Sequence, residues 1–529
     1  MDAPRDLLRT NVAVAAGTAV SRVTGLARIV VFGIVIGQTA VADAYDGANN
    51  SPNSIYELLI GGVFSAALVP VFTRLFNDDD DEAERAVVST AVVTLAALTA
   101  VAVACAPLIF RLFSLNPASG IDADRYRDVG TMLARVFLVQ IFFYGLTALA
   151  TAALNARRRF TAAAWAPVAS NVVIVGLLAL IPLSIDGRPG LDTVADNAGV
   201  RWLLGGGATL GIAATSLIVL LVARTAGLSI GVRPDFRHPA VRRLARLSLW
   251  TFGYVLTNQV ALVVVRNLAE PGSGGPDAYT KAFTFFQLPH ALLAASITTT
   301  FAPDLARAAA SADREAFVAR LSLGVRLITM LTLPFAALFF VTSRPMVGAL
   351  LQHGNFTADA AHTTARALMG FSVGLVGFSV YLFVLRGFYA HEDTRTPFVI
   401  NCFENALNVV LAVALVGRHG VLGLGLAFGI AYLVSAVVAL VVVERRHPEF
   451  GSFALVRSLA PMFAATVPAA VAAWAVGRAL GDTAGIGAMI RVAACYLVGG
   501  IAYVAALRVL RVRETTELVD RLRGFSARR

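Results

Sequence analysis

Two arginines lie inside the first long apolar stretch of the chain, where an ionised side chain is costly. Arg22 and Arg28 stand six positions apart, with Gly25 between them. An arginine at bilayer depth costs at least a few kcal/mol by insertion scales, so it usually faces a wet cavity or a paired anion. On one α-helix, six positions correspond to about 9 Å along the axis and about 120° around it. The spacing predicts a cationic cavity within a membrane, with room for an anion larger than chloride.

Further charged residues within or near apolar stretches are mostly basic. Arg266 and Lys281 flank the segment 269–278, and an interfacial position is almost as good an interpretation for them as a cavity-lining one. Glu57 is placed to neutralise one of the first arginines, and Asp43 stands near the outer end of the first helical hairpin, as a gate between lobes or as a helix cap. Because cations outnumber anions, we expect an anionic substrate or anionic lipid headgroups. Guanidinium suits phosphate, since its planar fork donates two hydrogen bonds at once.

Two later strings resemble motifs for other chemistry. Asn401, Glu404 and Asn405 are consistent with part of an ion site, and buried helix-packing amides are an equal alternative. The segment 423–429 imitates a dinucleotide-binding loop, but it opens an apolar helix without a preceding strand, which favours small-residue helix packing. No nucleotide site or catalytic constellation is evident. We therefore expect a transporter and not an enzyme, with no cofactor and with a coupling ion that stays unknown.

Composition indicates a membrane protein with many spans. Of 529 residues, 57% are hydrophobic and 15% are charged, and mean hydropathy is +0.73. A soluble domain is nearer one quarter charged. The net charge of +11 is attributed to loop arginines and membrane topology and not to nucleic acid. The three cysteines show no metal-ligand spacing and are expected as small buried residues. Arginine replaces lysine almost everywhere, which indicates a high-GC bacterium.

Apolar stretches predict about fourteen transmembrane helices and an all-α fold. Loop arginines concentrate on one set of alternate loops, which predicts that both termini are cytoplasmic. The predicted spans are 11–37, 53–76, 86–113, 130–154, 161–184, 202–223, 241–267, 279–302, 318–342, 362–388, 396–416, 421–443, 457–479 and 486–509.

An internal repeat divides these spans. The segment 68–74 resembles 301–307 at a displacement of 233 residues, and Asn171 matches Asn405 at 234. Six spans separate the copies, so the repeat predicts two parallel six-helix lobes, as in some secondary transporters. The predicted divisions are an N-lobe at 1–230, a C-lobe at 231–446, two further helices at 447–510 and a basic cytoplasmic tail at 511–529.

Several strings resemble the MurJ (MviN) family. They are Ser21-Arg22-x-x-Gly25-x-x-Arg28, Asp43-Ala44, Pro52-Asn53, Gly61-Gly62-Val63-Phe64-Ser65, Val69-Pro70, Leu154-Asn155-Ala156-Arg157-Arg158-Arg159-Phe160, His353-Gly354-Asn355-Phe356-Thr357, Arg386-Gly387-Phe388-Tyr389-Ala390 and Thr394-Arg395-Thr396-Pro397. The similarity runs from about residue 10 to about residue 510.

The resemblance implies a flippase of the bacterial cytoplasmic membrane that moves lipid II, the undecaprenyl-pyrophosphate-linked peptidoglycan precursor, by alternating access. It implies membership of the multidrug/oligosaccharidyl-lipid/polysaccharide exporter superfamily. Arg22 and Arg28 match the family's cavity arginines, and Asp43 matches its acidic residue near the first hairpin. Implied partners are lipid II or a similar polyprenyl-pyrophosphate lipid, membrane lipids and cell-wall synthesis proteins.

Two departures from the family pattern bear on the substrate. Where many members carry arginines, this chain has Tyr56 and Glu57, and later Thr284. Arg266 or Lys281 is a weak candidate to substitute for the last of these. The alternatives are therefore another polyprenyl-linked glycan as substrate, a multidrug exporter of the same superfamily, or a scaffold that recruits wall-synthesis partners without transport.

Overall fold

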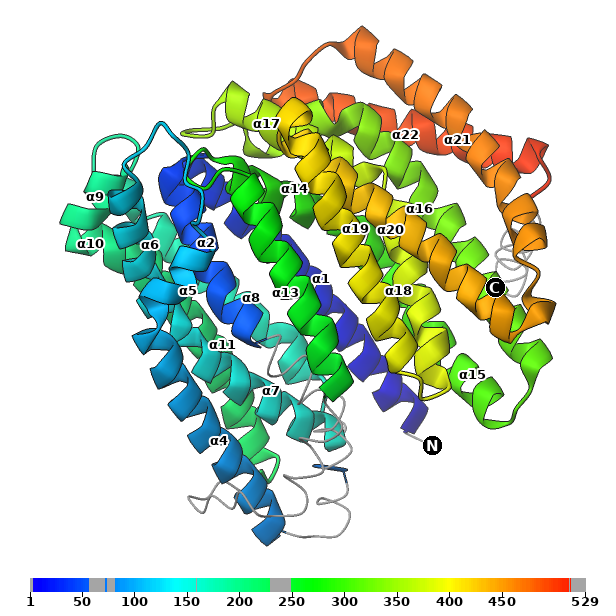
Figure 1. The fold of residues 1–529 in the computed structure, drawn as a ribbon, viewed down its shortest axis with the longest axis horizontal. Helices are drawn as coiled ribbons and strands as arrows, with labels where there is room; N and C mark the ends of the chain where they lie inside the picture. The colour runs from blue at the N-terminus through cyan, green and yellow to red at the C-terminus, as the bar shows by residue number, and fades with distance from the viewer. Residues whose placement is uncertain are drawn as a thin grey trace. The chain divides into compact units, whose positions relative to one another are not determined.

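The structure is a computed structural model that describes residues 3–56, 72–73, 81–157, 159–228, 249–512 and 514. Across these residues the chain forms α-helices with short 3₁₀ and π segments and no strand (Figure 1). The all-α architecture predicted from composition is confirmed for this part of the chain.

Two compact units divide the chain, and their boundary falls within α14 (Gly275–Pro289). The first unit is Met1–Asp277 with Gly354–Phe356, and the second is Ala278–His353 with Thr357–Arg529. The boundary predicted at residue 230 falls in a segment, 229–248, that lies outside the described residues. The predicted four-part division therefore stays a prediction.

The helices of each unit follow in chain order. The first unit contains α1 (Ala3–Ile36), α2 (Ala40–Tyr56), α4 (Asp81–Ala104), α5 (Ala106–Leu112), α6 (Ala123–Leu138), α7 (Gln140–Ala156), α8 (Thr161–Leu178), η2 (Ile181–Leu183), α9 (Leu191–Asp196), α10 (Ala198–Arg201), η3 (Trp202–Gly206), α11 (Gly207–Thr225) and α13 (Leu249–Leu268). The second contains most of α14, then η4 (His290–Ala294), α15 (Ala295–Ala310), α16 (Arg314–Leu351), α17 (Ala358–Ser372), α18 (Leu375–Ala390), α19 (Arg395–His419), α20 (Val421–Arg446), η5 (Pro448–Phe450), α21 (Ser452–Leu480) and α22 (Gly485–Val509).

Ten helical stretches in the described residues are long and apolar enough to cross a membrane. The bent pair α17 and α18, with an angle of 50° between them, raises this to eleven if it counts as one span. The predicted count of about fourteen is not confirmed. The predicted span 53–76 lies mostly outside the described residues. The seventh and eighth predicted spans are helical over their described residues but are not among the ten.

In the first unit, α8 packs between α1 and α11. The Trp165 indole Nε1 of α8 donates to the Ala13 carbonyl of α1 at 3.0 Å. Further along, the Asn171 Nδ2 donates to the Ser21 carbonyl and to the Thr24 hydroxyl at 3.2 and 3.0 Å. These bonds fix the rotation of α1 about its own axis.

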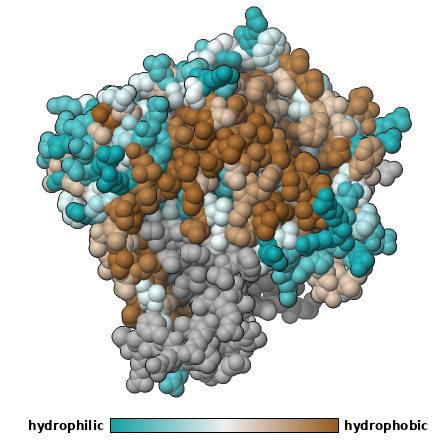
Figure 2. Space-filling view, viewed as in Figure 1, coloured by the Kyte–Doolittle hydropathy of each residue, from teal (hydrophilic) through white to brown (hydrophobic). Residues whose placement is uncertain are grey.

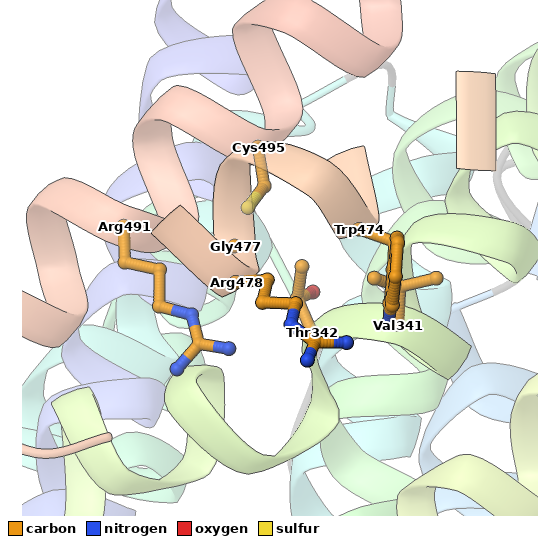
Figure 3. Close-up of a pocket in the computed structure, with 7 residues that line it drawn as sticks. All are labelled: Val341, Thr342, Trp474, Gly477, Arg478, Arg491 and Cys495. Atoms are coloured by element: carbon orange, nitrogen blue, oxygen red, sulfur yellow. The ribbon is translucent and has the colours of Figure 1, made fainter. Parts of the chain in front are cut away.

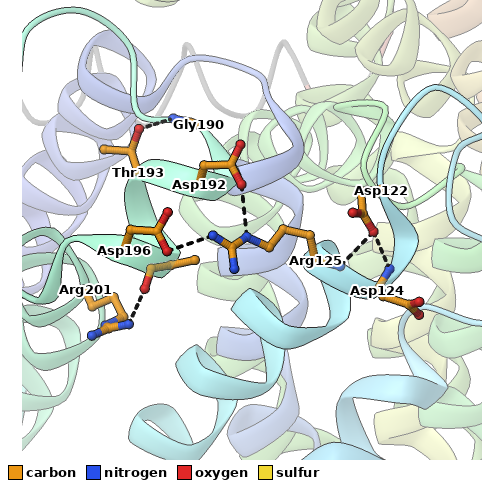
Figure 4. Close-up of polar contacts among 9 residues, drawn as sticks. Asp122, Asp124, Arg125, Gly190, Asp192, Thr193, Asp196 and Arg201 are labelled. Carbon is orange, nitrogen blue, oxygen red and sulfur yellow. Dashed lines mark hydrogen bonds and ion pairs between the residues drawn. The ribbon is translucent and has the colours of Figure 1, made fainter.

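The segment between η2 and η3 contains the short helices α9 and α10. Arg125 of α6 holds α9, because its Nε donates to Asp192 at 3.0 Å and its Nη2 to Asp196 at 2.8 Å (Figure 4). The Asp122 side chain caps the start of α6 by accepting from the backbone N–H groups of Asp124 and Arg125. The ion pairs of Arg125 and the cap formed by Asp122 are exposed, so they position this segment more than they stabilise the core.

In the second unit, the glycines of 423–429 bring α20 close to its neighbours. A Cβ at Gly425 would lie 2.6 Å from the Ala367 carbonyl of α17, and a Cβ at Gly429 would lie 2.9 Å from the Gly374 amide nitrogen. Only a residue without a side chain fits at such distances. The interpretation of this string as small-residue helix packing is confirmed.

Apolar side chains also cover the exterior, as a bilayer requires. Figure 2 shows them gathered over α19 and α20, where Val410, Val413 and Val437 are each more than half exposed. One sequence prediction fails for the same reason. Cys105 is exposed, although Cys495 is buried, because apolar residues of a membrane protein face lipid as well as the core.

Candidate substrate-binding site

Arg22, Gly25 and Arg28 lie on one uninterrupted helix, α1, as the spacing predicted. The face that carries Ser21, Thr24 and Gly25 packs on α8, and a Cβ at Gly25 would lie 3.6 Å from the Asn171 Nδ2. At 100° per residue, Arg28 shares this side and is half-buried, whereas Arg22 projects roughly 100° away and is exposed.

Neither arginine of α1 has a protein counter-ion among the described residues. No hydrogen bond or ion pair involves the Arg22 or Arg28 guanidinium within that part of the chain, although many other cations there are paired. Glu57, which was placed to neutralise one of them, lies outside the described residues. Among the described residues, these two cations on one helix therefore lack a protein counter-ion.

Asp43 of α2 is fully buried and binds the loop that precedes α14. Its Oδ2 accepts the backbone N–H groups of Gly272 and Gly274 at 2.8 and 2.7 Å, and its Oδ1 accepts that of Asp277 at 2.9 Å. Both glycines have positive φ, +96° and +87°, a conformation that other residues rarely adopt. Of the two alternatives for Asp43, a gate or a helix cap, the geometry supplies the cap, because the carboxylate accepts from the first turn of α14.

Arg266 of α13 is buried against α2. Its Nη1 pairs with the Asp46 carboxylate at 2.6 Å, its guanidinium lies 5.7 Å from the Phe113 ring centre, and the residue is 3% exposed. This placement gives Arg266 a structural partner, and its predicted part in substrate binding stays a prediction. Asp43 and Asp46 are one helical turn apart, a spacing that puts both carboxylates on the face of α2 toward this loop.

Asn267 was missed by sequence reasoning. Its Oδ1 accepts the Leu115 N–H at 2.6 Å, and its Nδ2 donates to the Leu112 carbonyl at 2.8 Å. These bonds tie the end of α13 to the end of α5. A single asparagine beside an arginine carries no sequence signal for such a role.

Lys281 and Thr284 lie on the part of α14 that belongs to the second unit. Lys281 is 4% exposed. The Thr284 hydroxyl donates to the Thr280 carbonyl of its own helix at 3.0 Å, so this side chain is used locally. The predicted substitution of Lys281 for a missing family arginine stays untested.

The candidate ion site lies on one face of α19. Asn401, Glu404 and Asn405 are 0%, 1% and 6% exposed, and the Asn405 Nδ2 donates to the Asn401 carbonyl at 3.0 Å. Asn408, which the sequence reasoning did not include, extends the same face and is 6% exposed. Neither carboxylate oxygen of Glu404 has a hydrogen-bond partner among the described residues. A buried carboxylate without a partner is costly unless it binds a cation or a proton. This cost favours an ion site at Glu404, which stays a prediction.

The helices and buried charges define the chain as a polytopic α-helical membrane protein, and solved structures identify its fold as that of MOP-superfamily transporters. A family model described as Lipid II flippase MurJ matches residues 33–492. The chain belongs to the lipid II flippase MurJ family.

Individual relatives agree with this assignment. A Burkholderia cenocepacia protein described as lipid II flippase MurJ is 29% identical over 460 residues, 83% of this chain and 84% of the relative. A Thermotoga maritima protein described as a probable lipid II flippase MurJ is 25% identical over 97% of this chain and 99% of the relative.

Two solved structures share the fold at lower identity. One, described as lipid II flippase MurJ in an inward closed conformation, has a TM-score of 0.73 at 21% identity and covers 94% of this chain and 99% of its own. An inward-facing multidrug resistance MATE family transporter has a TM-score of 0.62 at 16% identity, over 82% of this chain and 99% of its own.

Proposed function

We propose that this chain moves lipid II, a polyprenyl-pyrophosphate-linked glycan, across the bacterial cytoplasmic membrane by alternating access. The observation that carries the proposal is the pair Arg22 and Arg28, two cations on α1 without a counter-ion among the described residues. A pyrophosphate presents oxygens to both, and a guanidinium binds two of these oxygens in one plane. No covalent bond changes in this activity, so the chain acts as a transporter and not as an enzyme.

The orientation and energy source are part of the same proposal. Both termini are cytoplasmic, because loop arginines concentrate on their side. The membrane potential or an ion gradient supplies the energy, and the buried face of Asn401, Glu404 and Asn405 is the proposed ion site. α21 and α22 line a groove for the polyprenyl tail, and cytoplasmic loops contact cell-wall synthesis proteins.

A second candidate is a flippase for a different polyprenyl-linked glycan. The departures at Tyr56, Glu57 and Thr284 favour it, because fewer arginines are available for the headgroup. The pyrophosphate chemistry at Arg22 and Arg28 is the same for both substrates. A multidrug exporter would need carboxylates for cationic drugs, and a scaffold would need no arginines at bilayer depth.

The test is rescue of cells depleted of their own lipid II flippase. Wild type should restore growth, whereas Arg22→Ala and Arg28→Ala should fail at equal membrane expression. Each loses charge-assisted hydrogen bonds that contribute about 1.5–3 kcal/mol, or roughly a 10- to 150-fold loss of affinity. Arg111→Ala is the matched control, because it removes an exposed arginine from α5.

The outcomes separate the candidates. Failure of well-expressed wild type, combined with transport of another polyprenyl glycan in vesicles, would assign the second candidate. Equal rescue by wild type and both alanine variants would reject the arginine site.

A further inference from the structure

A pocket of about 170 Å³ lies in the second unit where α16, α21 and α22 meet. It is remote in sequence from the arginines of α1, and its two arginines have no part in the tail groove proposed above for α21 and α22. The residues that line it are Val341, Thr342, Trp474, Gly477, Arg478, Arg491 and Cys495 (Figure 3).

Two of these residues are arginines held in different ways. The Arg491 Nη1 donates to the carbonyls of Gly481 and Asp482 at 3.0 and 2.9 Å, which fixes this guanidinium against the α21–α22 turn. The Arg491 Nε is buried and has no hydrogen-bond partner among the described residues. The Arg478 guanidinium lies 5.4 Å from the Trp474 ring centre. Neither arginine forms an ion pair in the described part of the chain.

Gly477 lies beside the Arg491 guanidinium in the lining of the pocket. A Cβ there would lie 3.4 Å from the Arg491 Nε and 3.5 Å from its Nη2. In Figure 3 the two guanidinium groups point toward the same space below α21 and α22. The carboxylate of Asp482 is directed at Gly487, where a Cβ would lie 2.1 Å from its Oδ2, and it does not line the pocket. The pocket therefore has a positive charge of two without a lining acid.

The surroundings of the pocket are apolar and exposed. Val467 and Val471 of α21 are 63% and 58% exposed, and Met489 and Ile490 of α22 are 51% and 59% exposed. In a membrane these side chains contact acyl chains. The half-exposed Trp474 beside Arg478 is the combination typical of headgroup depth. A ligand that matches both the two arginines and their apolar surroundings has an anionic head and an apolar tail.

We propose that this pocket binds the phosphate group of an anionic membrane lipid through Arg478 and Arg491. A glycerophospholipid and a polyprenyl phosphate share this chemistry. With cytoplasmic termini, the α21–α22 turn and its lipid belong to the outer leaflet. The site does not depend on which substrate is transported, so its failure and that of the proposed function are distinguishable.

The experiment titrates the purified full-length chain in a non-ionic detergent. Brominated phosphatidylglycerol is the main probe, and its quenching of tryptophan fluorescence is assigned to this pocket by its loss in Trp474→Phe. Parallel arms use brominated phosphatidylcholine, and unlabelled undecaprenyl phosphate and inorganic phosphate as competitors. Arg478→Gln is the decisive variant, because Arg478 makes no hydrogen bond among the described residues and its loss leaves the turn intact. Arg418→Gln, an exposed arginine in the last turn of α19, is the matched control.

We expect phosphatidylglycerol to bind wild type and Arg418→Gln equally and Arg478→Gln about tenfold more weakly. Arg491→Lys keeps the charge but loses the fork, and it should weaken binding by a smaller factor. Competition by undecaprenyl phosphate at similar concentration would support the site and add the carrier lipid as a source. Equal affinity for phosphatidylcholine, equal binding by Arg478→Gln and the control, or displacement by inorganic phosphate at lipid concentrations would each overturn the proposal.

Discussion

The charges of the first unit fall into two groups, according to whether the protein supplies a partner. Arg157 is paired with Glu84 at 2.8 Å, and Arg266 is paired with Asp46. Asp43 accepts three backbone N–H groups. Each of these residues is buried, and removing one partner would leave a charge in a medium of low dielectric constant. Arg22 and Arg28 form the other group, because no partner for either lies in the part of the chain that the structure describes. Within that part, structural pairing does not account for the arginines of α1.

We expect Asp393, in the turn between α18 and α19, to make the stability of the folded state depend on pH. Burial tends to raise the pKa of Asp393, but hydrogen bonds from Thr396 and Arg446 more than offset it and lower this pKa from 3.8 to about 2. A carboxylate with a lowered pKa stabilises the folded state fully above its ordinary pKa. This contribution is then lost as pH falls from about 4 to about 2, and solvent screening of this partly exposed carboxylate keeps it small.

Asp393→Asn should therefore flatten the acid dependence of the unfolding midpoint between these pH values. Thermal unfolding of detergent-solubilised protein measures it. Glu392→Gln, the neighbouring carboxylate, is the control and should keep the wild-type slope. Identical slopes for wild type and Asp393→Asn would contradict the assignment.

The sequence predicted the positions of charged residues better than it predicted the groups that they contact. The place of Arg22 and Arg28 on one helix was predictable from their apolar context, and α1 is continuous as expected, whereas their depth in the membrane stays a prediction. The role of Asp43 was not predictable from the sequence, because its partners Gly272 and Gly274 lie about 230 positions away. Only a folded turn brings their amides together. No local pattern encodes a bond between a side chain and a distant backbone.

At the scale of elements, the contact of α17 with α20 depends on small residues. Gly425→Leu should lower the thermal unfolding midpoint substantially, because even a Cβ at this position meets the Ala367 carbonyl at 2.6 Å. Overpacking of this kind costs about 1–3 kcal/mol or more. Gly417→Leu in α19 is the matched control, since a Cβ there meets nothing within 4 Å. Equal midpoints for both variants would show that α17 and α20 separate easily.

The elements themselves were largely predictable from hydropathy, because a span must satisfy its backbone within one helix. The breaks within these helices were not predictable from hydropathy. The 50° bend between α17 and α18 and the π segments η3 and η4 arise inside apolar stretches where composition does not change. Exposure was also unpredictable from composition, as Cys105 shows.

At the scale of the whole molecule, charge predicts orientation. A reporter that is active only in the cytoplasm should work when fused after residue 529, and one that is active only outside should work when inserted at 481–484. The physical reason is the excess of arginine on the side of the termini. Paired fusions to a fluorescent protein and to alkaline phosphatase measure it, with normalised expression as the control. The reverse pattern would invert the leaflet assigned to the α21–α22 pocket.

The internal repeat reappears in equivalent contacts of the two units. Asn171 of α8 and Asn405 of α19 are both 6% exposed, and in each unit this helix packs on one neighbour, α8 on α11 and α19 on α20. A sequence match of a few residues was enough to detect this pairing. The extent of each unit was harder to predict, since α14 contributes to both.

The anchor at Asp43 has a consequence for how the loop before α14 moves. One carboxylate holds Gly272, Gly274 and Asp277, so no single bond can be released while the geometry of the others is kept. Opening must return one anion and three amides to water in the same event, and partial opening leaves unsatisfied groups in a dry interior. We therefore expect the three bonds to Asp43 to break together when the loop opens.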